Sequence, residues 1–283
     1  MILEHEIPQG SKLYFGDSAR LKRRIENIAS DVLYENGFEE IVTPLFSYHQ
    51  HHSIADEKEL IRVNDEKNHN ISLRADSTID VVRLIQKRLG RNTTQRKWFY
   101  IQPVFTYATN EQHQVGAESI GDEDLTSMIN LATQILQKLQ TKPLLQISNI
   151  KIPQILSEMF VELELDDFRH LNIDKMLSLN VDWLTRLVYL QHADQLDEVI
   201  ELAPQPIKEE LLRLKELAEG ISYDALVIAP MYYAKMLYYH KLFFRVIEGN
   251  EVYARGGEYK VDEQTSVGFA IYTDELIEKI GKK

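Results

Sequence analysis

The feature that most constrains the fold is a pair of adjacent extended segments in the middle of the chain. Residues 98–107 are rich in aromatic and β-branched side chains, and residues 113–120 follow after a loop at 108–112. Two such segments joined by a short loop predict antiparallel strands. Apolar residues recur at helical spacing over 18–36, and again from Leu125 to Leu139. Antiparallel strands flanked by amphipathic helices predict an α+β fold.

Turn and cap residues set the expected bounds of the remaining elements. In the first half of the chain we expect a helix at 18–36 capped by Asp17 and stopped by Gly37, a strand at 38–43 ended by Pro44, a strand at 71–74, and a helix opened by Asp76 and Ser77 that reaches Leu89. A further helix follows a cap at Asp122, then a strand at 144–149 and several helices within 152–220. The last part should hold a hairpin of 243–248 and 251–254 around Gly249-Asn250, a strand at 265–271 and a helix at 274–281.

Composition excludes several classes of function. With 32 basic and 44 acidic residues the formal charge is −12, which opposes the approach of a phosphate backbone, so no tRNA partner is expected. The basic cluster at 87–97 is interpreted as a solvated helix end and loop. The sequence contains no cysteine, and no apolar run is long enough to cross a bilayer, so we expect a cytoplasmic protein without a membrane partner.

Metal sites are conceivable at two kinds of place. The acids at 122–124 and 166–167 could bind a divalent ion, but acids at helix N-termini that complement the helix dipole explain them more simply. His49 and His51 would lie on one side of an extended segment, close to His52. No third ligand is identifiable, and His-rich loops are usually solvated, so neither a metal nor a cofactor is expected.

Three further segments point to a family. Leu73-Arg74-Ala75-Asp76-Ser77-Thr78, the two strand segments ending in Gln114–Gly121, and Gly268-Phe269-Ala270-Ile271 occur in the order and spacing of the amino-acid pocket and third motif of a class II synthetase. The chain thus resembles histidyl-tRNA synthetase from about residue 7 to residue 280. The resemblance implies an antiparallel sheet flanked by helices and one core domain over 1–283. It also implies a helical insertion at about 152–220 between the second and third motifs and, since the chain ends at 283, no anticodon-binding domain.

The positions that the family uses on ATP have changed. The family's Phe-Arg-x-Glu reads Phe105-Thr106-Tyr107-Ala108, and Glu275 occupies the place of the arginine that follows the third motif. A bidentate guanidinium is the side chain that best holds charge developing on phosphate oxygens, and neither threonine nor glutamate replaces it. Two histidine-specific motifs have also lost arginines. Arg-Gly-Leu-Asp-Tyr-Tyr has Ala234 in first place, and Ala-Gly-Gly-Arg-Tyr-Asp aligns with Arg255-Gly256-Gly257-Glu258-Tyr259-Lys260.

The positions that face the amino acid survive. Gln114 and Glu118 have the even spacing that places strand side chains on one face. By the resemblance, the candidate histidine-binding residues are Asp76, Thr78, Gln114, Glu118 and one or both of Tyr238 and Tyr239. Two alternatives remain: Asp76 is a helix N-cap, which is compatible with a ligand contact, or these polar groups satisfy one another around water.

The resemblance therefore implies a catalytically disabled relative of the synthetases, similar to the regulatory subunits of ATP phosphoribosyltransferase. Such a chain would form a homodimer and bind a short catalytic subunit. It would enable transfer of a phosphoribosyl group from phosphoribosyl pyrophosphate to N1 of ATP, in the first step of histidine biosynthesis, and help confer inhibition by histidine. Two rival hypotheses are a truncated enzyme that still adenylates an amino acid and a structural dimer with a vestigial pocket.

Overall fold

The computed structural model describes residues 6–48, 50, 54, 56–233, 239–261 and 263–282. Within these ranges a mixed sheet of eight strands has the order β1-β5-β6-β11-β10-β9-β7-β8, and a smaller sheet has the order β2-β4-β3. Only the edge pairs β1–β5 and β7–β8 of the larger sheet are parallel. The strands are β1 (Glu39–Glu40), β2 (Phe46–Ser47), β3 (Arg62–Asn64), β4 (Asn70–Leu73), β5 (Lys97–Thr106), β6 (Asn110–Ile120), β7 (Leu144–Asn149), β8 (Leu226–Ile228), β9 (Tyr239–Glu248), β10 (Glu251–Val261) and β11 (Gln264–Tyr272).

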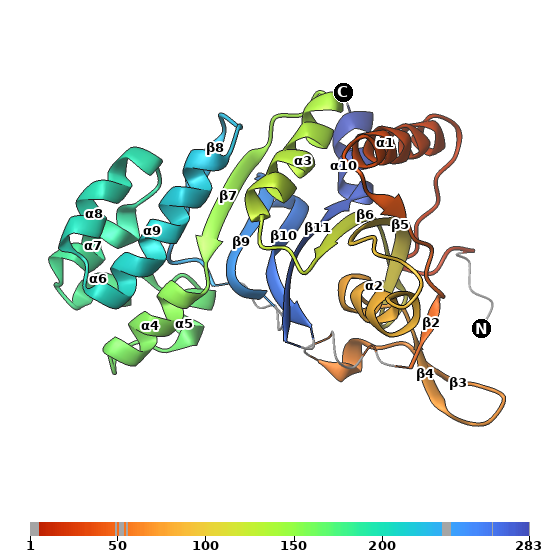
Figure 1. Ribbon diagram of the computed structural model, residues 1–283, viewed down its shortest axis with the longest axis horizontal. Helices are drawn as coiled ribbons and strands as arrows, with labels where there is room; N and C mark the ends of the chain where they lie inside the picture. Colours follow the sequence, from red (N-terminus) through yellow and green to blue (C-terminus); the bar gives the residue numbers. More distant parts are fainter. Residues whose placement is uncertain are drawn as a thin grey trace.

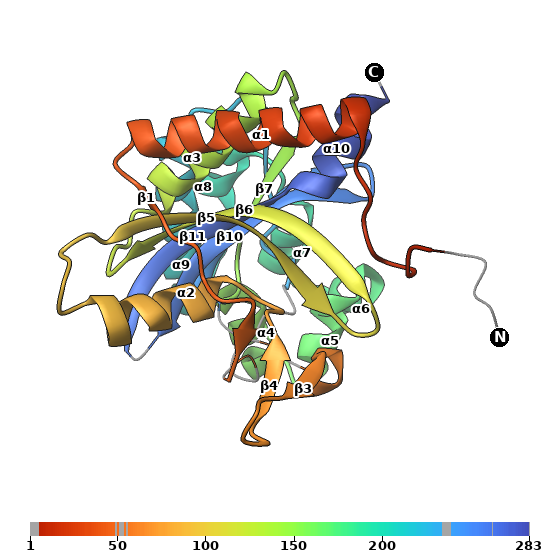
Figure 2. The same ribbon diagram turned by 90° about the vertical axis from the view of Figure 1, so that its right-hand side faces the viewer.

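Helices cover the two faces of the large sheet unequally. Figure 2 shows α1, α3 and α10 on one face and α2 with the small sheet on the other. Helices α4 to α9 gather at the far end of the molecule, beside β7 (Figure 1). The helices are α1 (Gly16–Glu35), α2 (Thr78–Leu84), which continues as a π-helical turn (Ile85–Leu89), α3 (Leu125–Lys138), α4 (Lys151–Met159), α5 (Leu165–Arg169), α6 (Ile173–Ser178), α7 (Asp182–Tyr189), α8 (Leu196–Leu202), α9 (Gln205–Gly220) and α10 (Thr273–Gly281), with short 3-10 turns at Glu57–Glu59 and Ala193–Gln195. The expected α+β fold is confirmed.

Strand alternation separates two cores. On β6, Val115 and Ala117 point into the main core under α1 and α3, whereas Gln114 and Glu118 point toward α2. The α2 side has its own apolar cluster, which includes Tyr100 and Tyr259. Because side chains alternate with period two, the same strands can bury an apolar face on one side and present polar groups on the other. The even-spacing argument therefore placed Gln114 and Glu118 on the correct face.

Two expected helix caps are wrong. α1 starts at Gly16, and Ser18 rather than Asp17 closes its N-terminus, because the Ser18 hydroxyl accepts from the Phe15 backbone N–H at 3.1 Å. α3 is capped by Asp124, whose carboxylate accepts from the Ser127 N–H at 2.9 Å. Asp122 instead accepts from the Ser119 hydroxyl. Several acids near a helix start compete for one cap, and spacing alone does not choose among them.

The expected stop at Gly37 is confirmed. Gly37 has φ +80°, a left-handed conformation that glycine adopts without steric cost. The N–H groups of Gly37 and Phe38 donate to the carbonyl oxygens of Tyr34 and Leu33, which is the Schellman arrangement.

Strand lengths differ from the expected ones in three places. Only Glu39–Glu40 of the segment 38–43 pairs as a strand, since the Thr43 N–H turns to the Gln102 side chain. The loop at 108–112 shrinks to a turn because β6 already begins at Asn110, paired with Thr106. The late hairpin is much longer than expected, because β10 runs through Arg255-Gly256-Gly257 up to Val261.

Candidate functional site

A cavity of about 180 Å³ lies between the α2 face of the large sheet and the start of α2. Its floor consists of residues of β6, β10 and β11, and its roof comes from the start of α2 and the segment that precedes it. The lining residues are Ile54, Ala75, Asp76, Thr78, Val104, Gln112, Gln114, Tyr239, Arg255, Tyr259, Gly268, Phe269, Ala270 and Tyr272. Four of the six predicted site residues are among them.

Asp76 is at once a helix cap and a cavity residue. Its carboxylate Oδ1 accepts from the Ile79 backbone N–H at 3.2 Å, at the first turn of α2. The Gln50 side chain holds the preceding turn, since its Oε1 accepts from the N–H groups of Ala75 and Asp76 at 2.8 Å each. The alternative of an N-cap and the prediction of a cavity residue therefore both hold. The helix start fixes this carboxylate at the cavity wall.

Arg74, in the same motif, has a structural role. Its guanidinium is buried and donates to the carbonyl oxygens of Pro103 and Thr43, at 2.9 and 3.1 Å, and also to that of Pro44. One side chain thus ties β5 and the segment after β1 to the roof of the cavity.

Two sets of hydrogen bonds tie the start of α2 to the strands, one through Ser77 and one through Thr78. The Gln114 amide donates to the Ser77 hydroxyl at 3.0 Å, and the Gln102 amide donates to the same oxygen at 3.0 Å. The Thr78 hydroxyl lies 3.3 Å from that of Tyr100. This network anchors the helix start to the strands, and Ser77, which was predicted only to open the helix, is its centre.

Glu118 lies behind the cavity wall rather than on it. It is fully buried, and its two carboxyl oxygens accept from the hydroxyls of Tyr259 at 2.6 Å and Tyr100 at 3.1 Å. Gly268 makes room for it, since a Cβ there would stand 1.8 Å from Glu118 Oε2. Burial, with the nearby charge of Asp76 adding to it, raises the pKa of Glu118 to about 8 against the lowering effect of the hydroxyl donors.

This raised pKa predicts a pH dependence of stability. The folded state retains the Glu118 proton up to about pH 8, whereas the unfolded chain loses it near the ordinary glutamate pKa of 4.5. Between these values the folded state binds more protons, so the free energy of unfolding falls as pH rises, by at most about 1.4 kcal/mol per pH unit for this group. Glu118→Gln should remove that contribution. Urea unfolding of both proteins at pH 5.5, 6.5 and 7.5 should give midpoints that diverge with pH, and parallel midpoints would contradict the assignment.

Of the two predicted site tyrosines, the structure describes only Tyr239. Tyr239 lines the cavity, where its ring stacks on Phe243 with centroids 6.0 Å apart. Tyr238 and Ala234 lie outside the described residues, as do His49, His51 and His52. Among the residues that the structure describes, no group of three potential metal ligands occurs, and no helix is long and apolar enough to cross a membrane.

Sequence reasoning missed Arg255, Tyr259 and Tyr272 as cavity residues. The sequence contained part of the information needed to find these residues. Arg255 and Tyr259 lie an even number of residues apart on one strand, and Gly268 and Tyr272 likewise on the next, so each pair shares a face. What was not available was the pairing of β10 with β11, which brings these faces to Gln114.

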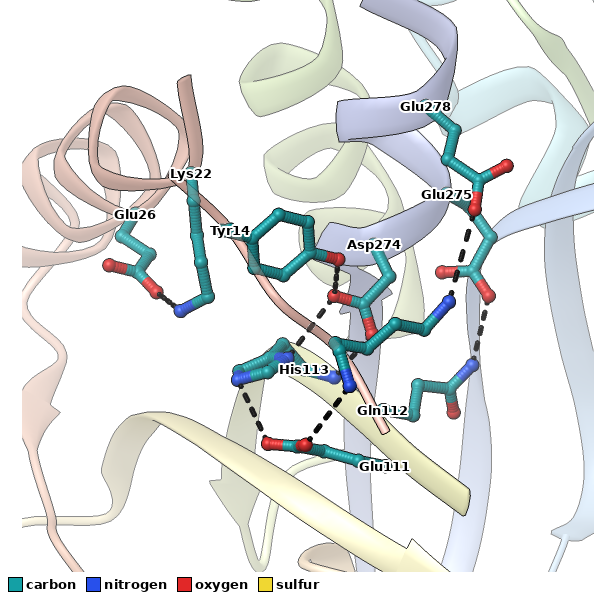
Figure 3. Close-up of polar contacts among 10 residues, drawn as sticks. Tyr14, Lys22, Glu26, Glu111, Gln112, His113, Asp274, Glu275 and Glu278 are labelled. Carbon is teal, nitrogen blue, oxygen red and sulfur yellow. Dashed lines mark hydrogen bonds and ion pairs between the residues drawn. The ribbon is translucent and has the colours of Figure 1, made fainter. Parts of the chain in front are cut away.

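The end of the cavity near α10 is occupied by carboxylates and their partners. Figure 3 shows Gln112 donating to Glu275, and Asp274 accepting from Tyr14 and from the backbone and ring of His113. The second oxygen of Glu275 is buried without a partner, and burial raises its pKa. Thr106 ends β5, half-buried. The two positions where the resemblance places arginines on ATP thus hold a hydroxyl and a half-buried acid.

Known proteins share this combination of fold and motifs. The sequence model of a family described as histidyl-tRNA synthetase matches residues 15–276. The ATP phosphoribosyltransferase regulatory subunit of Wolinella succinogenes is 52% identical over 280 residues, which are 99% of this chain and 97% of that protein. The regulatory subunit of Helicobacter hepaticus is 46% identical over 98% of this chain and 99% of its own. The chain belongs to the ATP phosphoribosyltransferase regulatory subunits.

Membership of this regulatory subunit family confirms the function that the resemblance implied, namely a regulatory role in histidine biosynthesis. Solved structures share the class II synthetase-like fold. A Bacillus halodurans protein described as an ATP phosphoribosyltransferase regulatory subunit/histidyl-tRNA synthetase superimposes with a TM-score of 0.85 at 20% identity, over 99% of this chain and 84% of that one. A histidine–tRNA ligase subunit of Alicyclobacillus acidocaldarius has a TM-score of 0.76 at 19% identity over the whole of both chains.

Proposed function

We propose that this regulatory subunit binds histidine in the cavity beside α2 without activating it, and that the bound histidine regulates a short catalytic subunit. The observation that carries the proposal is the contrast between the two ends of one site. Asp76, Thr78, Gln114 and Tyr239 line the cavity, whereas Thr106 and Glu275, the latter held by the cavity residue Gln112, stand at the positions that the resemblance assigns to ATP.

Each cavity residue has a chemical assignment in this proposal. The Asp76 carboxylate receives the α-ammonium group, because an anion fixed at a cavity wall forms a charge-assisted hydrogen bond with it. Thr78 and Gln114 add neutral hydrogen bonds, and Tyr239 provides an aromatic wall. Glu118 is assigned the imidazole N–H. To reach it, the Tyr259 hydroxyl that now donates to Glu118 must turn away.

The ATP end supports the absence of adenylation. A triphosphate would face the half-buried Glu275 carboxyl at the start of α10. Like charges repel, and no guanidinium stands at position 106 to offset the repulsion. Transfer of the phosphoribosyl group from phosphoribosyl pyrophosphate to ATP would then take place on the partner. In this proposal the chain is a single cytoplasmic core domain over 1–283, without a tRNA partner, in which the helices at 152–220 are an insertion.

Calorimetry tests the histidine assignment directly. Histidine should bind the wild-type chain, and Asp76→Asn should weaken it by roughly tenfold or more, because a charge-assisted hydrogen bond is worth about 1.5–3 kcal/mol. Asp174→Asn, at an exposed acid of α6, is the matched control and should bind as the wild type does. If histidine produces no binding heat with or without the catalytic subunit, the cavity is vestigial and the structural-dimer hypothesis gains.

The proposed homodimer has a candidate surface next to the cavity roof. Val42, Leu45, Phe46 and Tyr48 are 82%, 39%, 52% and 55% exposed, and we call them the 42–48 patch. Contiguous exposed apolar side chains mark interaction surfaces, and a two-fold interface uses the same patch twice.

Light scattering should therefore give twice the 33.0 kDa chain mass. Phe46→Asp should raise the dimer dissociation constant by tenfold or more, since it buries a charge at the interface. Val161→Asp provides the control, because Val161 is 95% exposed after α4, among the helices far from the patch. A monomeric wild-type chain at micromolar concentration would exclude the dimer.

A further inference from the structure

Arg255 occupies an unusual place on the cavity floor. It lies on β10, directly opposite Ala270 of β11 and Arg245 of β9, and its side chain lines the cavity with Tyr239 and Tyr272. Cross-strand neighbours point to the same face of a sheet. Because Ala270 is small, the guanidinium has room above the strands.

The charge of Arg255 has no acidic partner among the described residues, where the ion pairs all involve other cations. Its guanidinium carbon lies 6.0 Å from the centroid of the Tyr272 ring. A half-buried guanidinium over an aromatic face, without a carboxylate, is stabilised incompletely.

A second arginine increases this imbalance. Arg245 packs 3.9 Å from the centroid of the Tyr232 ring and donates to Gln146 at 2.8 Å, while its Nε is buried without a partner. Burial and the charge of Arg255 both lower the pKa of Arg245. Two neighbouring cations without an acid between them are an arrangement that a bound anion stabilises.

Arg255 also departs from the family motif. In the aligned motif Ala-Gly-Gly-Arg-Tyr-Asp, Arg255 stands where the family has alanine. In the motif Arg-Gly-Leu-Asp-Tyr-Tyr, whose arginine the resemblance assigns to the amino-acid carboxylate, this chain has Ala234 followed by Lys235, both outside the described residues. The motif arginine before β9 is replaced, and another arginine stands on β10.

We propose that Arg255 binds the carboxylate of the amino acid in this cavity and so replaces the arginine that is lost at position 234. The inference rests on the proposed function, since it names a specificity determinant of the same site. Asp76 on the roof and Arg255 on the floor then match the ammonium and carboxylate of an α-amino acid. Asp76 and Arg255 line the same cavity of about 180 Å³ together with Tyr239 and Tyr272.

The test compares histidine with histidinol, in which a hydroxymethyl group replaces the carboxylate while the ammonium and imidazole remain. Calorimetry on the wild type should show histidine binding roughly ten- to a hundredfold more tightly than histidinol. Arg255→Ala should lose most of the histidine affinity and leave that of histidinol nearly unchanged, so the two ligands become similar. Arg255→Lys should restore part of the preference. Lys260→Ala, at an exposed cation of the same strand, is the control.

The outcomes separate the two proposals. If the wild type prefers histidine and Arg255→Ala keeps the same preference, Arg255 is not the carboxylate site, while histidine binding stands. If the wild type binds both ligands equally, carboxylate recognition is absent, and the inference is wrong whatever the variants show. If the wild type binds neither ligand, the proposed function fails and takes the inference with it. Should Arg255→Ala not fold, judged by its circular dichroism, the wild-type comparison and Arg255→Lys decide.

Discussion

Addition of this chain to the short catalytic subunit of ATP phosphoribosyltransferase from the same organism should raise the rate of phosphoribosyl transfer and make it sensitive to histidine. Couplings between sites are typically about 1–3 kcal/mol, so we expect a change of roughly 5- to 150-fold in each case. Formation of product from phosphoribosyl pyrophosphate and ATP gives the rate, and light scattering gives the mass of the complex.

The same coupling must appear in binding. If histidine changes the affinity between the subunits by some factor, the catalytic subunit must change the affinity for histidine by the same factor, because the four equilibria form a closed cycle. Calorimetric titration of histidine with and without the catalytic subunit gives the factor by which the partner changes the histidine affinity. Titration of one subunit with the other, with and without histidine, gives the factor by which histidine changes the affinity between the subunits.

A variant separates activation from inhibition. Asp76→Asn should still activate the catalytic subunit, since Asp76 lies inside the cavity, but inhibition should need roughly tenfold more histidine. If the chain changes neither the mass nor the activity of its catalytic subunit, the proposed partnership is wrong. If Asp76→Asn keeps the wild-type response, the feedback site lies elsewhere.

The isolated chain should not activate histidine or any other amino acid. Loss of one preorganised donor to a charged transition state costs about 10²–10³-fold in rate, and the resemblance places two ATP-facing arginines where this chain has Thr106 and Glu275. The two losses need not add, yet their combination leaves no adenylation distinguishable from background. Histidine-dependent exchange of pyrophosphate into ATP is the appropriate measurement.

The control for this assay is a histidyl-tRNA synthetase at equal concentration. Histidine binding to the same preparation must be shown by calorimetry, so that absence of exchange is not absence of substrate. Exchange clearly above a sample without protein would favour the truncated-enzyme hypothesis, and Asp76→Asn should then abolish it.

Much of the fold follows from local patterns. Helical and strand periodicities are properties of neighbouring residues, so the order of elements, the stop at Gly37 and the shared face of Gln114 and Glu118 could be predicted. Errors gathered where a choice depends on distant contacts. The long β10 was missed because Gly256 and Gly257 interrupt its pattern, and these glycines are needed where Phe244 and Phe243 of β9 pack close to the backbone.

The sequence by itself determined the family and which residues stand at the motif positions, among them Thr106 and Glu275, because each is a matter of residue identity at a known spacing. The tertiary structure alone decided which polar groups reach the cavity. Glu118 was predicted on the wall and lies behind it, while Arg255 entered no prediction and lies on the floor. How deeply a side chain lies within the site depends on the space that residues of neighbouring strands leave, here Gly268 and Ala270. The pairing of β6, β11 and β10, which are distant in sequence, sets that space.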